Sequence, residues 1–299
     1  MAVGPAHDPR ASSCQRADTN NILTPPQLLP YPQIVLFGDS IIQGATDVSS
    51  GFSLQAALQA QVVRRFDVVN RGFSGYNTSN ALSVLPHIFA PPTPGSPELK
   101  YLFILFGAND ACVPLPTNFQ RVPLDKYREN LTRIVNHPNI TAHKPRIFLI
   151  TPPPLDQIRV TVLDMANGHP AAARHTKVSA VYSEAARQVA AANPGVTLID
   201  LHKAIMDRAI EKTPGFNPNP KGPALGDPEG GRRGYLEHLL PDGLHLSAES
   251  YRIFYDLVRP HVGTEWAGTR DEERAAYVLP DWRDAPWLEE DAHLKGKSL

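Results

Sequence analysis

Short, uniformly apolar runs alternate along the chain with longer segments in which apolar residues are spaced as in a helix. The short runs are rich in Val, Ile, Leu and Phe and stop at turn residues, which is typical of buried β-strands. We expect strands at 34–37, 67–70, 101–106, 146–150 and 196–201. In the longer segments apolar residues recur every three or four positions, which predicts amphipathic helices at 52–63, 124–135, 173–192 and 247–258.

This alternation predicts an α/β fold. Strands separated by crossover helices pair in parallel, and a parallel sheet is covered by helices on both faces. We therefore expect one three-layer domain with a five-stranded parallel sheet over residues 33–262. A helical bundle is excluded, because the runs at 101–106 and 146–150 are too short and too uniformly apolar for amphipathic helices.

The two ends of the chain differ in character. Residues 1–32 are polar and proline-bearing and are expected to form a leader with little structure. The extension at 263–299 contains all three tryptophans (Trp266, Trp282 and Trp287), and disordered segments are poor in aromatic residues. We therefore expect 275–288 to dock on its own domain or on a neighbouring subunit, so that a homo-oligomer through this extension is one expectation.

Composition narrows the class of protein. The 299 residues carry a formal net charge of -1, which gives no electrostatic footprint for nucleic acid. No apolar run approaches the roughly 18 residues of a membrane span, and the N-terminus lacks the apolar core of a secretory signal. Only Cys14 and Cys112 are present, so a disulfide framework is not expected and a reducing cytoplasm is the simplest setting.

Polar motifs follow the predicted strands, at the edge where the carboxyl ends of parallel strands meet. Each motif combines a glycine with hydroxyl, amide, carboxylate or imidazole side chains. They are GDS (38–40) after the first strand, NRGFSG (70–75) after the second, GANDA (107–111) after the third and DGLHLS (242–247) before the last helix.

Together these residue types are the parts required for acyl transfer. A serine such as Ser40 is a poor nucleophile until a base takes its proton, and His245 is the candidate base. Asp242 lies three residues before it and is close enough to orient the ring. The oxyanion of a tetrahedral intermediate needs preorganised donors, which the main-chain N–H groups of Ser40 and Gly72 and the side chain of Asn109 can supply.

Each motif alone also has a purely structural interpretation. Gly-Asp-Ser and Asp-Gly are common turn sequences, Asn109-Asp110 suits a helix cap, and a single histidine is more often structural than catalytic. Four unrelated structural motifs that happen to gather at one sheet edge are less expected than one functional site formed by all four. The chain has no G-x-S-x-G elbow, which argues against an α/β-hydrolase of the usual kind.

These motifs, in this order, resemble the four sequence blocks of the GDSL, or SGNH, hydrolases over residues 33–262. The strings FGDSI, VVNRGFSGYNT and DGLHLS are most similar to the branch that contains isoamyl acetate-hydrolysing esterases. The resemblance implies a flavodoxin-like sheet, Ser40 as nucleophile, His245 as base, Asp242 as its orienting acid, and an oxyanion hole of Ser40, Gly72 and Asn109. The motif reads GDSI rather than GDSL, a change at an apolar packing position.

The leading hypothesis is a serine esterase for small or short-chain acyl esters that uses no cofactor and no metal. A carbohydrate deacetylase or a hydrolase of lipid esters or thioesters is an alternative of the same mechanism, and Phe73 and Tyr76 are candidates for sugar stacking. A non-catalytic binding module predicts loss of Ser40, Asp242 or His245, and none is lost. A phosphate-binding protein is disfavoured, because no Gly-rich phosphate loop follows a strand.

A Pro- and Gly-rich insertion loop at 213–234 leads to the DGLH motif. Long irregular loops inside compact domains are often lids or binding loops, although a passive insertion is the plainer interpretation. We predict that this loop borders the acyl or alcohol pocket and is mobile.

Overall fold

The sheet has five strands, all parallel, in the order β2-β1-β3-β4-β5. It is seen in a computed structural model that describes residues 30–219, 222–266, 274 and 277–295. The strands are β1 (Gln33–Gly38), β2 (Asp67–Gly72), β3 (Leu99–Leu105), β4 (Arg146–Ile150) and β5 (Val196–Ile199). This confirms the predicted fold class, a doubly wound flavodoxin-like sheet.

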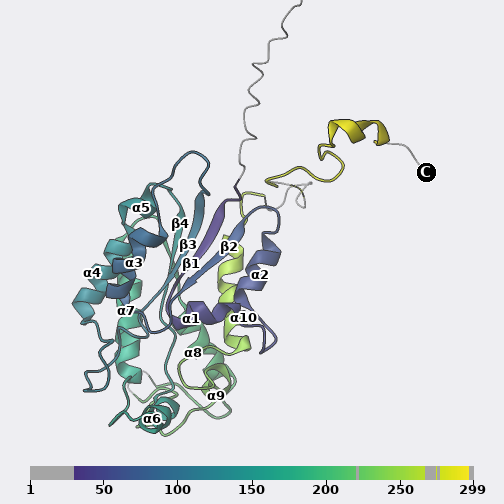
Figure 1. Ribbon diagram of the computed structural model, residues 1–299. Coiled ribbons are helices and arrows are strands. Elements are labelled where there is room, and N and C mark those ends of the chain that lie inside the picture. Colours follow the sequence, from purple (N-terminus) through teal and green to yellow (C-terminus); the bar gives the residue numbers. More distant parts are fainter. Residues whose placement is uncertain (1–29, 220–221, 267–273, 275–276, 296–299) are drawn as a thin grey trace, which may run out of the picture.

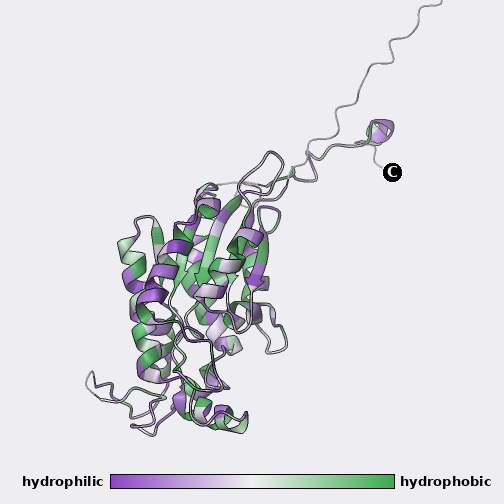
Figure 2. Cartoon of the chain, turned by 60° about the vertical axis from the view of Figure 1, so that its left-hand side comes forward, coloured by the Kyte–Doolittle hydropathy of each residue, from purple (hydrophilic) through white to green (hydrophobic). Residues whose placement is uncertain are grey.

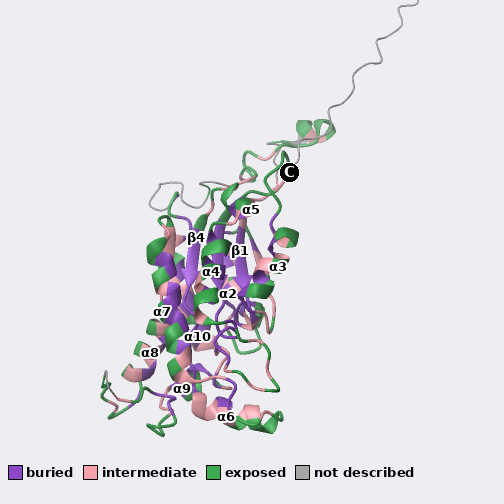
Figure 3. Cartoon of the chain, turned by 90° about the vertical axis from the view of Figure 1, so that its left-hand side faces the viewer, coloured by how far each residue is buried: buried purple, intermediate pink, exposed green. Residues whose placement is uncertain are grey.

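Helices cover the two faces of the sheet in two layers (Figure 1). One layer comprises α2 (Leu54–Gln61), α8 (Leu201–Glu211) and α10 (Ala248–Val258), and the other comprises α3 (Thr78–Ile88), α4 (Leu124–Val135) and α7 (Thr176–Ala192). Alternate residues of β1 serve the two cores: Ile34 and Leu36 face the first layer, and Val35 and Phe37 face the second. Figures 2 and 3 show the result, with apolar, buried strands between helices whose outer faces are polar and exposed.

Short helices complete the chain. They are α1 (Ser40–Gln43), α5 (Pro138–Thr141), α6 (Gln157–Ala166), α9 (Leu236–Leu239) and three 3₁₀ helices at Gly44–Thr46, Arg259–His261 and Glu289–Leu294. Of these, α1, α6 and α9 lie towards the edge at which the strands end (Figure 1). No helix among the described residues is long and apolar enough to cross a membrane.

Most predicted elements lie within a few residues of the observed ones. The predicted helix at 173–192 begins only at Thr176, because Arg174 pairs with Cys112 in an isolated antiparallel bridge. The predicted strand at 196–201 ends at Ile199, because Asp200 caps α8 by accepting a hydrogen bond from the Lys203 N–H. The helices α3, α6 and α8 were not among the predicted helices; α3 begins with a polar turn and contains a proline.

The extension that follows α10 begins by packing on the domain. Trp266 is buried against Phe66, with ring centroids 5.6 Å apart. Farther along, the Val278 N–H donates to the Arg64 carbonyl at 3.0 Å. Trp282, by contrast, is 73% exposed. Docking of the more distal part on a neighbouring subunit stays a prediction, and the predicted leader lies outside the described residues except for 30–32.

Candidate active site

Ser40 is the first residue of α1, directly after β1 ends. Asp39 caps this short helix: its Oδ1 accepts a hydrogen bond from the Ile41 N–H at 2.9 Å. Gly38 is required by close packing, because a Cβ there would lie 2.4 Å from both the Leu105 carbonyl oxygen and Ile42 Cγ1. The strand therefore turns at once into a helix and leaves the half-buried Ser40 at the carboxyl edge of the sheet.

A chain of hydrogen bonds joins Ser40, His245 and Asp242. His245 Nε2 lies 2.8 Å from Ser40 Oγ, and its Nδ1 lies 2.6 Å from Asp242 Oδ2. The other carboxylate oxygen of Asp242 accepts from the main-chain N–H groups of His245 at 2.7 Å and Leu244 at 2.9 Å. Because a carboxylate only accepts, Nδ1 carries the ring proton and Nε2 is left to accept the serine proton.

The turn that brings these residues together is tightly packed. Gly243 has a φ of +87°, in the left-handed region. A Cβ at Gly243 would lie 2.7 Å from the carbonyl oxygen of Asp156, the residue that caps α6. The Asp156 N–H in turn donates to the Gly243 carbonyl at 2.9 Å. The start of α6 therefore holds the Asp242–His245 turn in place.

The contact between Asp242 and His245 shifts the pKa of both residues. Burial opposes ionisation of Asp242, but hydrogen bonds from the His245 ring and two main-chain N–H groups lower its pKa to about 2. The hydrogen bond to Asp242 raises the pKa of His245, against the opposing effect of burial. The carboxylate thus stays ionised at neutral pH and favours the imidazolium that forms when a base takes a proton.

Asp39 and Asp110, one in each of two strand-end motifs, are fully buried. Burial raises the pKa of Asp39 to about 7 and that of Asp110 to about 6. Asp110 accepts from the N–H of Thr78 at 3.0 Å and from its hydroxyl at 2.5 Å, and so ties the start of α3 to the end of β3. Asp39 Oδ2 has no hydrogen-bond partner among the described residues.

The predicted donors of the oxyanion hole are not all free. The Ser40 N–H lies in the first turn of α1, where helix geometry leaves N–H groups without a partner. Asn109 Nδ2 carries two N–H groups. One of them donates to the Tyr76 carbonyl at 2.9 Å, and the other remains for a second acceptor. The Gly72 N–H, however, donates to Asn70 Oδ1 at 2.8 Å.

The structure thus gives Gly72 a different role from the one predicted. A Cβ at this position would lie 2.0 Å from the Gln43 main-chain nitrogen, so glycine allows α1 to lie against β2. The donor left free in the same motif is the N–H of Gly75, which has no acceptor among the described residues. Gly75 has a φ of +81° and precedes Tyr76, the residue that Asn109 contacts. The sequence signal was the second glycine of GFSG.

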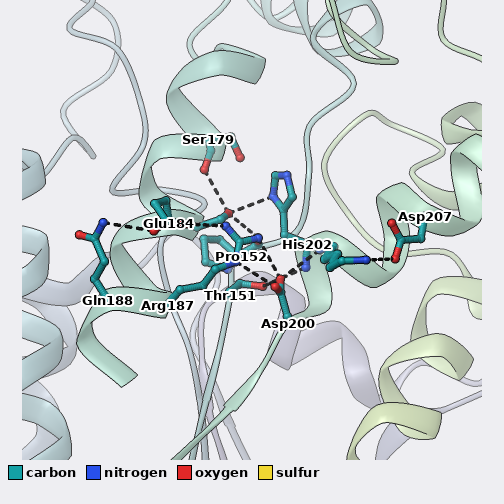
Figure 4. A network of polar contacts seen from close by, with 11 residues as sticks. Thr151, Pro152, Ser179, Glu184, Arg187, Gln188, Asp200, His202 and Asp207 are labelled. Atoms are coloured by element: carbon teal, nitrogen blue, oxygen red, sulfur yellow. Dashed lines mark hydrogen bonds and ion pairs between the residues drawn. The ribbon is translucent and has the colours of Figure 1, made fainter. Parts of the chain in front are cut away.

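A second group of serine, histidine and aspartate side chains lies where α7 packs near the ends of β4 and β5; Figure 4 labels its histidine, His202, and its aspartate, Asp200. Ser183 Oγ lies 3.0 Å from His202 Nδ1 and 2.9 and 3.1 Å from two main-chain carbonyls. Because carbonyls only accept, the hydroxyl proton goes to one of them and the His202 ring donates to Ser183. Asp200 pairs with Arg187 at 2.8 Å instead of with the histidine. This serine has no base.

The loop at 213–234 is attached to the site at several points. Leu225 lies in the core, and the Gly226 carbonyl accepts from the Ile158 N–H in α6. Arg233 forms an ion pair of 2.6 Å with the buried Asp156. A hollow of about 550 Å³ lies beside the loop, lined in part by Ile158, Met165, Ala172, His175 and Pro228. These contacts place the described part of the loop next to the DGLH turn; its mobility stays a prediction.

No group of three or more His, Cys, Asp or Glu side chains within the described part of the chain is arranged to hold a metal ion. Cys112 is a buried free cysteine.

Comparison with known proteins found a family model, related sequences and similar structures. Residues 36–253 match the sequence model of the GDSL-like Lipase/Acylhydrolase family. A GDSL esterase/lipase of Arabidopsis thaliana is 31% identical over 245 residues, which cover 80% of this chain and 89% of that protein. The isoamyl acetate-hydrolyzing esterase of Saccharomyces cerevisiae is 29% identical over 86% of this chain and 96% of its own length.

Some matches of higher identity are shorter. The mouse isoamyl acetate-hydrolyzing esterase 1 homolog is 39% identical over 145 residues, and the match covers 48% of this chain and 54% of that protein. Among solved structures, an acetyl xylan esterase superposes with a TM-score of 0.53 at 18% identity, covering 77% of this chain and 99% of that one. This structural likeness concerns the fold alone.

Proposed function

The chain belongs to the GDSL-like lipase/acylhydrolase family and is a carboxylic ester hydrolase, and from this premise we propose that it cleaves small or short-chain acyl esters of the acetate type. The observation that carries the proposal is the hydrogen-bonded chain from Ser40 through His245 to Asp242. It joins a half-buried hydroxyl to a base whose second nitrogen is held by a carboxylate.

In the proposed reaction Ser40 Oγ attacks the ester carbonyl carbon while its proton passes to His245 Nε2. Asp242 stabilises the resulting imidazolium. The carbonyl oxygen becomes an oxyanion, and we propose that the main-chain N–H groups of Ser40 and Gly75 and the side chain of Asn109 donate to it. Collapse of this intermediate breaks the bond to the alcohol, which leaves with the proton from His245.

The second half of the reaction repeats these roles with water. His245 takes a proton from a water molecule, whose oxygen attacks the acyl carbon. The intermediate then releases the acid and returns the proton to Ser40. No step requires a cofactor.

The substrate class rests on two supports. The relatives from yeast and mouse are named for hydrolysis of isoamyl acetate. A hollow lies between α6 and the 213–234 loop, and the start of α6 contacts the DGLH turn through the hydrogen bond from Asp156 to Gly243; we propose that the acyl or alcohol group extends into this hollow. Phe73 and Tyr76, the candidates for sugar stacking, stack on each other with centroids 5.1 Å apart and pack on the core of the α3–α4–α7 layer. This favours the small ester over the carbohydrate alternative.

A panel of p-nitrophenyl esters from acetate to palmitate tests the proposal, with Ser40→Ala as the control. We expect the largest kcat/KM for the shortest esters and no activity in the variant. A maximum at palmitate would transfer the assignment to lipid esters. Hydrolysis of acetylated xylan in preference to every member of the panel would favour the deacetylase.

A further inference from the structure

An arginine that no sequence motif pointed to lies beside the candidate oxyanion hole. Arg174 comes from the segment just before α7, which pairs with Cys112 through an isolated β-bridge. A second main-chain hydrogen bond, from the Val113 N–H to the Ala173 carbonyl at 2.8 Å, fixes the same two segments. The main chain therefore holds Arg174 opposite the loop that follows β3.

The guanidinium of Arg174 contacts the GAND motif at two consecutive residues. Its Nε donates to the Ala108 carbonyl at 2.9 Å, and its Nη2 donates to Asn109 Oδ1 at 2.8 Å. The same Nη2 lies 3.2 Å from Gln120 Oε1. A planar guanidinium with several donors fixes both the position and the plane of the groups that it binds.

We infer that Arg174 is a positioning residue that sets the orientation of the Asn109 amide in the oxyanion hole, an inference that rests on the proposed function. An asparagine amide has an accepting end and a donating end of nearly equal size. Only the donating end stabilises an oxyanion, and the accepting end repels it. Arg174 holds the oxygen, and so Nδ2 is the end that donates to the Tyr76 carbonyl and, in the proposed reaction, to the oxyanion.

The charge of Arg174 acts on the base as well. His245 is influenced by the carboxylates of Asp242 and Asp39, which favour its protonated form, and by Arg174, which disfavours it. These are the charged groups that act on the imidazole, which is hydrogen-bonded to Asp242 and to the hydroxyl of Ser40. Removal of the positive charge therefore shifts the acid limb of the kcat/KM profile to higher pH. Arg174→Lys keeps the charge and should leave this limb in place, which separates the effect of the charge from that of the hydrogen bonds.

The competing explanation is that Arg174 only joins the loop at 108–120 to the segment at 172–174. Two substitutions separate the roles. Arg174→Met removes the hydrogen bonds and the charge, whereas Arg174→Lys keeps the charge but offers a single point of contact in place of the planar fork. Arg128 is a matched control, since it is a half-buried arginine of α4 that donates to Asp125 of the same helix and to Gln188 of α7.

The experiment is steady-state kinetics on p-nitrophenyl acetate from pH 5 to 9. We expect Arg174→Met to lower kcat roughly 10- to 100-fold, less than the roughly 10²–10³ for loss of the donor in Asn109→Ala. KM should change little, because the oxyanion forms only in the transition state. The acid limb should move to higher pH in Arg174→Met but not in Arg174→Lys, and Arg128→Met should match the parent.

The double variant Arg174→Met/Asn109→Ala decides whether the arginine acts through the amide. We expect it to be no slower than Asn109→Ala, because the orientation of an absent amide cannot matter. Additive losses, or an Arg174→Met enzyme with parental kcat and pH profile, would overturn the inference. If Arg174→Met fails to fold, Arg174→Lys and its combination with Asn109→Ala provide the same cycle. An active Ser40→Ala enzyme would instead overturn the proposed function.

Discussion

The two groups of serine, histidine and aspartate at the carboxyl edge of this sheet differ in how each histidine is partnered. His245 donates to Asp242, which raises the pKa of the imidazole. His202 has no carboxylate partner, because Asp200 is paired with Arg187. Burial, reinforced by the charge of Arg187, lowers the pKa of His202 to about 4. One ring is poised to take a proton near neutral pH, and the other is held neutral.

The two serines differ in the same way. Ser40 is half-buried, and its Oγ lies 2.8 Å from the accepting nitrogen of His245. Ser183 is fully buried and accepts a hydrogen bond from His202 while it donates to a carbonyl. The comparison teaches that residue types at a sheet edge do not identify a site. What identifies it is the order of donors and acceptors along the chain of contacts.

Alanine substitutions at both groups should have the largest and most unequal effects. We expect Ser40→Ala and His245→Ala each to lower kcat by roughly 10⁴–10⁶, because nucleophile and base act as one unit. Ser183→Ala should leave kcat unchanged and lower stability by about 1–3 kcal/mol, the cost of removing a buried hydrogen-bonding group. Kinetics and thermal unfolding on all three variants measure this difference. Loss of catalysis in a stably folded Ser183→Ala would break the comparison.

Substitution of the neighbouring polar residues should give a smaller contrast. Asn109→Ala should reduce kcat roughly 10²–10³, the usual loss for one oxyanion donor. Thr151→Val is the counterpart in the second group, where the buried hydroxyl contacts Asp200 at 3.2 Å. It should reduce the melting temperature without reducing kcat. Equal kcat values for the two variants would remove Asn109 from the proposed hole.

The pH dependence should separate the two histidines. His245 must be neutral to accept a proton, and its pKa is raised above the ordinary 6.5, so kcat/KM should fall as pH drops through a value above 6.5. Asp39 also favours the imidazolium, but its own pKa is raised to about 7, so it is only partly ionised over this pH range and Asp39→Asn should move the acid limb only slightly to lower pH. Histidine NMR titration should show His202 neutral down to about pH 4. An acid limb below 6 in the parent would contradict the assignment.

The smallest effect concerns the ion pair that occupies Asp200. Arg187 lowers the pKa of Asp200, although burial opposes this. The pair therefore stabilises the fold above pH 3.8, the ordinary aspartate pKa, and this contribution is lost as pH falls through the lowered value. The Arg187→Met variant should therefore have a lower melting temperature than the parent at pH 7, with parental kcat. This difference in melting temperature should disappear at acidic pH. A difference that is independent of pH would assign the loss to packing.

Much of the fold and of the site followed from sequence pattern alone. Strand ends, helix faces and the positions of Ser40, Asn109, Asp242 and His245 depend on local periodicity and on the rule that parallel strands end at one edge. The structure brings Ser40, Asp242 and His245 into contact, as their positions after the first strand and just before the last helix suggested.

The remainder depended on contacts that a linear pattern does not encode. Whether the N–H of Gly72 or of Gly75 is free depends on the Asn70 side chain, which folds back onto the strand end. Arg174 reaches Asn109 across 65 residues of sequence. The cytoplasmic setting and a homo-oligomer through the C-terminal extension remain predictions.

The central claim is that Ser40, and not another serine at this edge, is the nucleophile. Reaction of the folded protein with a fluorophosphonate, followed by intact and peptide mass spectrometry, tests it most directly. A serine made nucleophilic by a neighbouring base displaces fluoride from phosphorus and retains the phosphonyl group. We predict one adduct per chain, located on Ser40 and absent from His245→Ala. An adduct on Ser183, or labelling of Ser40 that persists in His245→Ala at the parental rate, would contradict the account.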